Sequence, residues 1–172
     1  MDQRDASDLG CSIASAAEVV GERWNLLIMR DAFYGVRRFA DFHAHLGIAR
    51  NILSSRLKWL VAHGVMERHL YRSRPDRHEY VLTTKGHDFF PVLAALMQWG
   101  DTWAANGTGP PRSLSHGDCG QDGIHAVASC SACGGMLDAD SVRVDPLPEP
   151  IRDRVSSSLE RWRSEMSDLP TT

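Results

Sequence analysis

Two short helical segments joined at a single glycine restrict this chain more than any other feature of its sequence. Apolar residues at helical spacing predict one helix over residues 37–46 and another over residues 49–63, with Gly47 in the tight turn between them. Gly64 follows the second segment and predicts its end. Two helices joined by a short glycine-containing turn are typical of the helix-turn-helix motif, which favours binding to DNA.

A β-hairpin is predicted directly after the second of these helices. Residues 65–71 and 78–82 are rich in side chains that favour strands, and a Pro-Asp pair at Pro75 interrupts the pattern between them. Helix, turn, helix and hairpin in this order are more specific than any of the parts alone. They predict a winged helix-turn-helix, which is an α+β fold that is mostly α.

Three more helices are predicted around this motif. Residues 12–20 form a short helix, and residues 22–34 form a second one that is apolar enough to be buried on nearly all sides. A long helix follows the hairpin, begins at an N-cap near Thr83 and runs to Trp103. Pro91 cannot lie unstrained deep inside a helix, so a kink or a restarted first turn is expected there.

The predicted helix over residues 49–63 has two unlike faces. At 100° per residue, Leu53, Leu57 and Leu60 share a narrow arc that would anchor the helix to a core. The opposite arc carries side chains that can contact bases and phosphates, although any surface helix has one polar side. The candidate DNA-reading residues on this arc are Arg50, Asn51, Ser54, Ser55 and Lys58.

Positive charge is concentrated where the motif lies. Residues 23–87 carry 12 Lys/Arg and 5 Asp/Glu, a net charge of +7, whereas the rest of the chain carries 7 and 17, a net charge of −10. A basic middle with acidic flanks favours a polyanion as partner, although a chance distribution of surface charge is the alternative. The arginines expected to contact DNA phosphates lie at the hairpin tip and at the start of the third helix: Arg72, Arg74, Arg77, Arg37 and Arg38.

A cysteine-bearing segment, residues 116–146, follows a predicted linker at residues 105–115. It contains His-x-x-Cys-Gly and Cys-x-x-Cys-Gly, a pattern that can hold one tetrahedral ion between two tight turns. The predicted ligands of a structural zinc ion are His116, Cys119, Cys130 and Cys133. His125 is a substitute candidate, and a flexible reduced tail or a disulfide within the second pair is the alternative.

The remaining features limit the class of protein. Residues 147–172 are predicted to form an amphipathic helix of open role. The chain has no apolar run near the roughly 18 residues of a membrane span, and the polar start at Met1–Asp5 is unlike a signal peptide, so a cytoplasmic location is expected. An enzyme is not expected, because a zinc deaminase would need His-x-Glu and Pro-Cys-x-x-Cys, where this chain has Asp118 and Ser129.

From Cys11 to about Trp99 the chain resembles the HxlR family of winged helix-turn-helix regulators. The motifs that carry the resemblance are Cys11-Ser-Ile-Ala, Gly21-Glu-Arg-Trp, Leu27-Ile-Met-Arg-Asp, Arg37-Arg-Phe-Ala-Asp-Phe, Ile48 to Leu60, Gly64-Val-Met-Glu-Arg and Glu79-Tyr-Val-Leu-Thr-Thr-Lys-Gly. The resemblance implies a homodimer that regulates transcription by binding double-stranded DNA at an inverted-repeat operator. Residues 11–104 would then serve DNA binding and dimerisation.

The resemblance also implies candidates for the interface and for a signal. The apolar residues expected between the protomers are Ile13, Val20, Leu93, Leu96 and Trp99. Cys11 corresponds to a cysteine that senses oxidants or electrophiles in some members, so an oxidant or a small molecule is the expected signal, whereas an inert buried thiol is the ordinary alternative. A MarR-type regulator and a winged helix used only for protein contacts are the competing functions.

Overall fold

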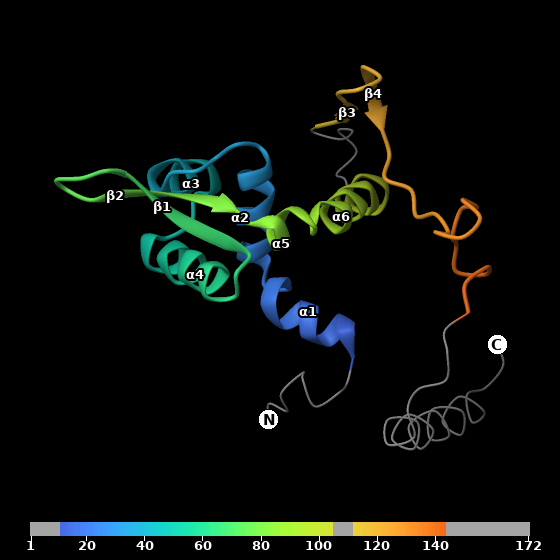
Figure 1. Cartoon of the computed structure of the whole chain (residues 1–172), viewed down its shortest axis with the longest axis horizontal. Helices are drawn as coiled ribbons and strands as arrows, with labels where there is room; N and C mark the ends of the chain where they lie inside the picture. Colours follow the sequence, from blue (N-terminus) through green and yellow to red (C-terminus); the bar gives the residue numbers. More distant parts are fainter. Residues whose placement is uncertain (1–10, 105–111, 144–172) are drawn as a thin grey trace, which may run out of the picture.

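The computed structural model describes residues 11–104 and 112–143 (Figure 1). The elements in chain order are α1 (Ser12–Val20), α2 (Arg23–Phe33), α3 (Phe39–Leu46), α4 (Arg50–Ala62), β1 (Met66–Arg72), β2 (Arg77–Leu82), α5 (Thr84–His87), α6 (Phe90–Trp103), β3 (Leu114–His116) and β4 (Gln121–Ile124). The first four helices agree with the predicted helices to within two residues at each end. The predicted winged helix-turn-helix is confirmed. None of the helices in the described ranges combines the length and the apolar character that crossing a membrane requires.

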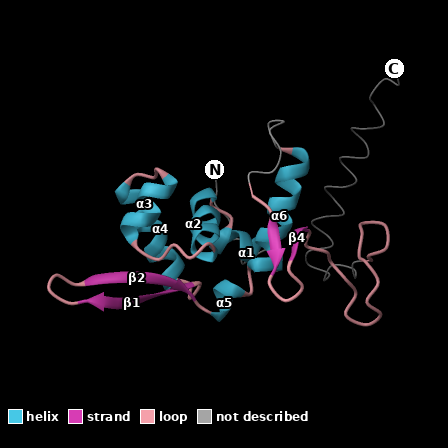
Figure 2. Ribbon diagram, turned by 90° about the horizontal axis from the view of Figure 1, so that it is seen from above, coloured by secondary structure: helices cyan, strands magenta, loops and turns pink. Residues whose placement is uncertain are grey.

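Helix α2 lies at the centre of the body. It packs against α1, α3, α4, α6 and β2, and in both views it separates α6 from α3 and α4 (Figures 1 and 2). Ile28 and Met29 are fully buried, as the apolar sequence of this helix predicts. Leu26 and Leu27 are only half-buried, so the side of α2 that faces α6 is not fully covered.

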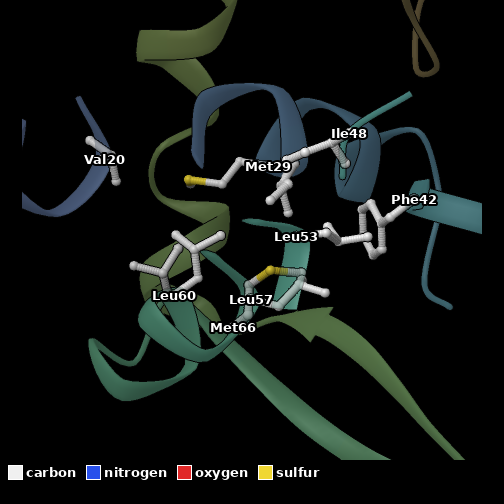
Figure 3. Close-up of a cluster of buried hydrophobic side chains, with 10 residues drawn as sticks. Val20, Met29, Phe42, Ile48, Leu53, Leu57, Leu60 and Met66 are labelled. Carbon is white, nitrogen blue, oxygen red and sulfur yellow. The ribbon is translucent and has the colours of Figure 1, made fainter. Parts of the chain in front are cut away.

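The apolar core joins the helix-turn-helix to the hairpin. Leu53, Leu57 and Leu60 of α4 are fully buried, so the arc predicted to anchor this helix does so. They meet Phe42 from α3 and Met66 at the start of β1 (Figure 3). Burying a side chain of this size stabilises the fold by about 1.5–3 kcal/mol. The position of α4 is therefore fixed by packing rather than by its polar face.

The turn between α3 and α4 depends on glycine. Gly47 follows α3 with φ +62°, a left-handed conformation that side chains disfavour, and its N–H donates to the carbonyl of His43 at 3.1 Å. The ring Nδ1 of His43 in turn lies 2.8 Å from the carbonyl oxygen of Ile48, across the turn. Ile48 is buried below. The angle between the two helices is thus set by one glycine, one histidine and one apolar contact.

The hairpin forms a wing whose register shifts between Leu70 and Arg72. β1 pairs antiparallel with β2, from Met66 opposite Leu82 to Arg72 opposite Arg77. The chain before α3 adds to its edge, because Arg38 pairs with Glu79. In both views the loop joining the strands projects beyond α3 and α4 (Figures 1 and 2). The wing therefore extends from the same side of the body as the helix-turn-helix.

The predicted interruption at Pro91 is also present. The short α5 ends at His87, and α6 begins at Phe90 with the proline in its first turn, where the missing N–H costs no hydrogen bond. Thr83 caps α5, accepting a bond from the N–H of Gly86 at 3.2 Å. A Cβ on Gly86 would collide with the carbonyl of Val65, so the chain after the wing passes close to its base only because this residue is glycine.

The segment after the body differs in part from the prediction. Strand β3 begins at Leu114, two residues inside the predicted linker, because Leu114 is half-buried and pairs with Ile124 of β4. The first part of that linker, residues 105–111, and the predicted last helix within 147–172 lie outside the described residues.

Candidate nucleic-acid interface

The polar face of α4 is open to solvent. Arg50, Asn51, Ser55 and Lys58 are exposed, and Ser54 is half-exposed, on the side of the helix opposite the three buried leucines. The first turn of a helix presents free backbone N–H groups, which favour anions. The predicted DNA-reading residues therefore share one accessible surface, with Arg50 and Asn51 at its amino end.

Two contacts hold the rest of α4 in place. The indole N–H of Trp59 donates to the carbonyl of Val19 at 3.0 Å, so this residue contacts the neighbouring helix α1. The guanidinium of Arg56 lies 3.5 Å from the carboxylate of Glu22, the N-cap of α2, in an ion pair between α4 and α2. At 100° per residue Trp59 lies on neither the leucine arc nor the polar arc of α4, whereas residue type and spacing give no sign of the partner of Arg56.

The two arginines before α3 lie at the edge of the wing rather than free at a helix start. The carbonyl of Arg37 accepts the N–H of Tyr80 at 2.8 Å, which ties this segment to β2. The guanidinium of Arg38 lies 4.8 Å from the centre of the Tyr71 ring, in a cation–π contact with β1. Tyr71 was missed from sequence, because a strand residue in a basic hairpin does not show which cation stacks on it.

The wing arginines surround the loop between β1 and β2. Arg72, Arg74 and Arg77 are all exposed. Among the residues that the structure describes, none of these three, nor Arg37, Arg38, Arg50 or Lys58, forms a salt bridge with an acidic side chain. Their charges remain available to an external anion.

Comparison with known proteins identifies the family to which this fold belongs. A family model described as HxlR-like helix-turn-helix matches residues 19–108. The HTH-type transcriptional regulator Rv3095 of Mycobacterium tuberculosis is 47% identical over 139 residues, which are 81% of this chain and 87% of the relative. The chain belongs to the HxlR family. It is a DNA-binding transcriptional regulator of the helix-turn-helix class, and the match decides against the MarR alternative.

Solved structures extend the similarity of the HxlR-family chain beyond its body. The crystal structure of PA1607, a candidate transcription factor, superposes with a TM-score of 0.70 at 38% identity and covers 78% of this chain and 94% of its own. A second candidate transcription factor, PA1374 of Pseudomonas aeruginosa, gives 0.58 at 39% identity, covering 84% and 99%. The redox regulator HypR in its reduced form gives 0.51 at 26% identity, covering 54% and 92%.

The residues predicted for the dimer interface of this HxlR-family protein fall into two groups. Val20 is buried within the protomer, whereas Leu93 is half-buried and packs partly against the core of the same protomer. Ile13, Leu96 and Trp99 are exposed, and Trp99 keeps 61% of its surface accessible. Apolar periodicity shows that a helix has a buried face, but not whether its own chain or a second copy covers it.

A cavity of about 610 Å³ lies between α2 and α6 beside this apolar surface. Its walls are mainly apolar, and Arg30 and His45 stand at its edge. Both hold the fully buried carboxylate of Asp31: Arg30 Nη2 and His45 Nδ1 each lie 2.8 Å from one of its oxygens. The presence of Asp31 in an otherwise apolar helix was a signal in the sequence that this carboxylate needs partners, but this signal was missed.

The four predicted zinc ligands form two separate pairs. Nδ1 of His116 lies 3.3 Å from the sulfur of Cys119 in the turn between β3 and β4, whereas Cys130 and Cys133 share a later turn. Hydrogen bonds from the backbone N–H groups of Ala132 and Cys133 lower the pKa of the Cys130 thiol. In residues 11–104 and 112–143, no three His, Cys, Asp or Glu side chains converge on one point. One shared zinc site stays a prediction.

Cys11 lies at the amino end of the HxlR-family fold. It is the N-cap residue of α1 and is exposed. The alternative in which it is a small buried apolar residue therefore does not apply to this protomer.

Proposed function

We propose that this HxlR-family protein binds an inverted-repeat operator as a homodimer, with α4 of each protomer in the major groove of one half-site. The observation that carries the proposal is the exposed polar face of α4 above three fully buried leucines. The major groove is about 12 Å wide and accepts one α-helix, so a helix held rigidly by its apolar face can present its polar face to base edges.

The proposed contacts follow from the chemistry of the side chains. Arg50 can pair with guanine and Asn51 with adenine through two hydrogen bonds each, which gives sequence choice. Ser54, Ser55 and Lys58 would add contacts to bases or phosphates. The arginines of the wing and Arg37 would neutralise phosphates, which fixes position and makes binding sensitive to salt.

A homodimer is supported by the apolar surface of α6. Phe90, Val92, Leu96 and Trp99 are exposed there, and Ile13 on α1 is 80% accessible. Single exposed apolar residues are ordinary, but several on one helix mark an interaction surface. A second copy placed across α1 and α6 would cover them. Two copies would present their α4 helices to half-sites about one DNA turn, roughly 34 Å, apart.

The test begins with operator selection from random DNA, followed by titration of wild-type protein and three variants over a range of salt. Arg50→Ala and Asn51→Ala should relax the choice of base at one position each, costing about 1–3 kcal/mol of discrimination. Arg74→Ala should weaken all duplexes alike and flatten the salt dependence. Arg143→Ala, which removes an exposed charge on the tail, is the matched control.

Two results would contradict the proposal. If no duplex is bound even at low salt, the wing and α4 serve protein contacts instead. If Leu96→Asp still sediments as a DNA-binding dimer, the interface does not lie on α6. A monomeric Leu96→Asp that binds a half-site weakly would support both parts.

Oxidant sensing through Cys11 is a second candidate function. It is favoured by the exposure of this thiol at the N-cap of α1 and by the structural similarity to the redox regulator HypR. A pulse of diamide, which joins two thiols as a disulfide by accepting two protons and two electrons, should release DNA from the native protein and spare Cys11→Ser. Equal release from both proteins would assign the effect to other cysteines. The same pulse on Cys130→Ser tests whether the tail cysteines cause it.

A further inference from the structure

In the part of the tail that the structure describes, the side chains form no apolar core. Not one of the described residues from 112 to 143 is buried. Within residues 112–143 the one sheet is the pair β3–β4, with strands of three and four residues. An isolated hairpin of this size is marginally stable in water. The order of the segment must therefore have a source other than burial.

The first turn of the tail places two ligand side chains together. In His116-Gly-Asp-Cys119-Gly120, the N–H of the final glycine donates to the carbonyl of His116 at 2.8 Å, and Gly120 has φ +67°. The ring Nδ1 of His116 faces the sulfur of Cys119 at 3.3 Å. The other ring nitrogen lies 3.7 Å from the carboxylate of Asp118. A carboxylate beside the distal nitrogen is a recurrent feature of histidines that bind metal.

The second turn repeats the first. In Cys130-Ser-Ala-Cys133-Gly134, the N–H of the final glycine donates to the carbonyl of Cys130, again at 2.8 Å, and Gly134 has φ +73°. The N–H of Cys130 also donates to the carbonyl of Gly135 at 2.8 Å, which closes the turn. Both turns thus have one backbone plan, a left-handed glycine in the fifth position, and ligand residues in the first and fourth.

We propose that the two turns are the halves of one structural zinc site, with His116, Cys119, Cys130 and Cys133 as its four ligands. Zinc in structural sites takes four nitrogen or sulfur ligands in a tetrahedron, and each turn offers only two. Three thiols would lose their protons to solvent on binding, and four protein ligands would leave no open position for catalysis. The site is independent of DNA recognition.

Joining the turns requires little of the rest of the fold. The turns are separate in Figure 1, where the β3–β4 hairpin lies apart from the segment that follows it. Residues 125–128, which connect them, belong to no helix or strand and are not buried. The proposal requires a change in the backbone angles of this connector that brings one turn to the other. Zinc binding would then supply the stabilisation that the tail lacks from burial.

The experiment uses the full chain, purified in reductant without chelator. Elemental analysis should find about one zinc per chain for a four-ligand site. After exchange with Co²⁺, the visible spectrum should show the intense bands of a tetrahedral ion and the charge-transfer bands of thiolate ligands. Cys119→Ser and Cys130→Ser, one from each turn, should both lose the stoichiometric metal, and so should His116→Asn.

Two variants serve as controls. Cys11→Ser removes a thiol outside the tail, and His125→Ala removes the substitute ligand, so both should keep the metal. Circular dichroism should show that the helices of the body keep their fold in every variant. DNA binding is measured separately, so that a failure of the zinc site is not confused with a failure of operator recognition.

Three outcomes would overturn the proposal. One is reduced, zinc-supplemented protein that holds no metal, with or without a Cys130–Cys133 disulfide on later oxidation. Another is loss of metal in Cys130→Ser but not in Cys119→Ser, because the turns would then not share an ion. The third is loss in His125→Ala with retention in His116→Asn, which would overturn the ligand set.

Discussion

The winged-helix body and the tail of this protein are built on different principles. In the body, nine apolar side chains from α2, α3, α4, β1 and the adjoining turns are at most 2% exposed, and they meet in one cluster. In the described part of the tail, no side chain reaches that state, and the segment is shaped by turns. In one of these turns, Ser141 and Asp140 donate backbone N–H groups to the carboxylate of Asp138, which lowers its pKa.

The contrast shows which interactions fix a functional surface. The polar face of α4 can be exposed because its apolar face is locked, and the wing is attached to the same core through Met66. Between residues 112 and 143 no apolar face is buried in this way, so packing does not hold polar side chains at fixed distances there. Stability in the body should therefore respond to lost methyl groups, whereas stability in the tail should not.

The largest effect is expected from Leu57→Ala in the body. Leu57 is fully buried on α4 among the core residues, and a cavity left in such a site costs about 2–5 kcal/mol. The free energy of unfolding, measured by urea titration and circular dichroism, should fall by that amount. A loss below about 1 kcal/mol would mean that the core tolerates cavities and that the contrast with the tail is weaker than proposed.

Gly86→Ala should have the next largest effect, through overpacking rather than a cavity. The added Cβ would collide with the backbone carbonyl of Val65, which cannot move without disturbing the base of the wing. Overpacking of this kind costs about 1–3 kcal/mol. Thermal unfolding should reveal it, and Gly100→Ala is the control, because a Cβ there meets no atom within 4 Å. Equal behaviour of the two variants would contradict this reading.

A smaller loss is expected from Trp59→Phe. The phenylalanine ring can keep the aromatic contact with His63, whose ring centre lies 3.9 Å away, but it cannot donate to Val19. Losing one neutral hydrogen bond costs about 0.5–1.5 kcal/mol. Asn25 donates to the same carbonyl. In a double-mutant cycle of Trp59→Phe with Asn25→Ala, the two losses in the free energy of unfolding should therefore not be additive. Additive losses would mean that the two donors act independently.

The smallest effect is expected from Val127→Ala in the tail. Val127 is 67% exposed, and surface substitutions away from special features change stability by no more than about 0.5 kcal/mol. This substitution removes apolar carbon atoms, as Leu57→Ala does, so it is the matched counterpart of the core variant. A loss above 1 kcal/mol would reveal packing in the tail and would end the contrast between the two regions.

The same contrast explains what the sequence could predict. Where apolar periodicity agrees with the positions of glycine and proline, helices and turns can be predicted. The leucine arc of α4, the turn at Gly47 and the break at Pro91 were all predicted and are all present. Sequence spacing alone predicted the metal ligands in the tail. It defines the two ligand pairs, but it does not define the distance in space between one pair and the other.

Features that depend on tertiary contacts were not predictable. Val20 has the same apolar character as Ile13, but only the fold shows that the first is buried within the protomer and the second is exposed. Likewise, the stacking of Arg38 on Tyr71 joins residues far apart in sequence. Residue type and spacing carry no information about such pairs.

The carbonyl of Val19 joins α1 to both α2 and α4 through hydrogen bonds. It accepts the amide of Asn25 at 2.9 Å and the indole of Trp59 at 3.0 Å, at the far end of α1 from Cys11. At a rise of 1.5 Å per residue, α1 separates Cys11 from this carbonyl by about 12 Å along the helix axis. A displacement of α1 would therefore reach Trp59, near the carboxyl end of α4, through hydrogen bonds to one carbonyl rather than through the apolar core.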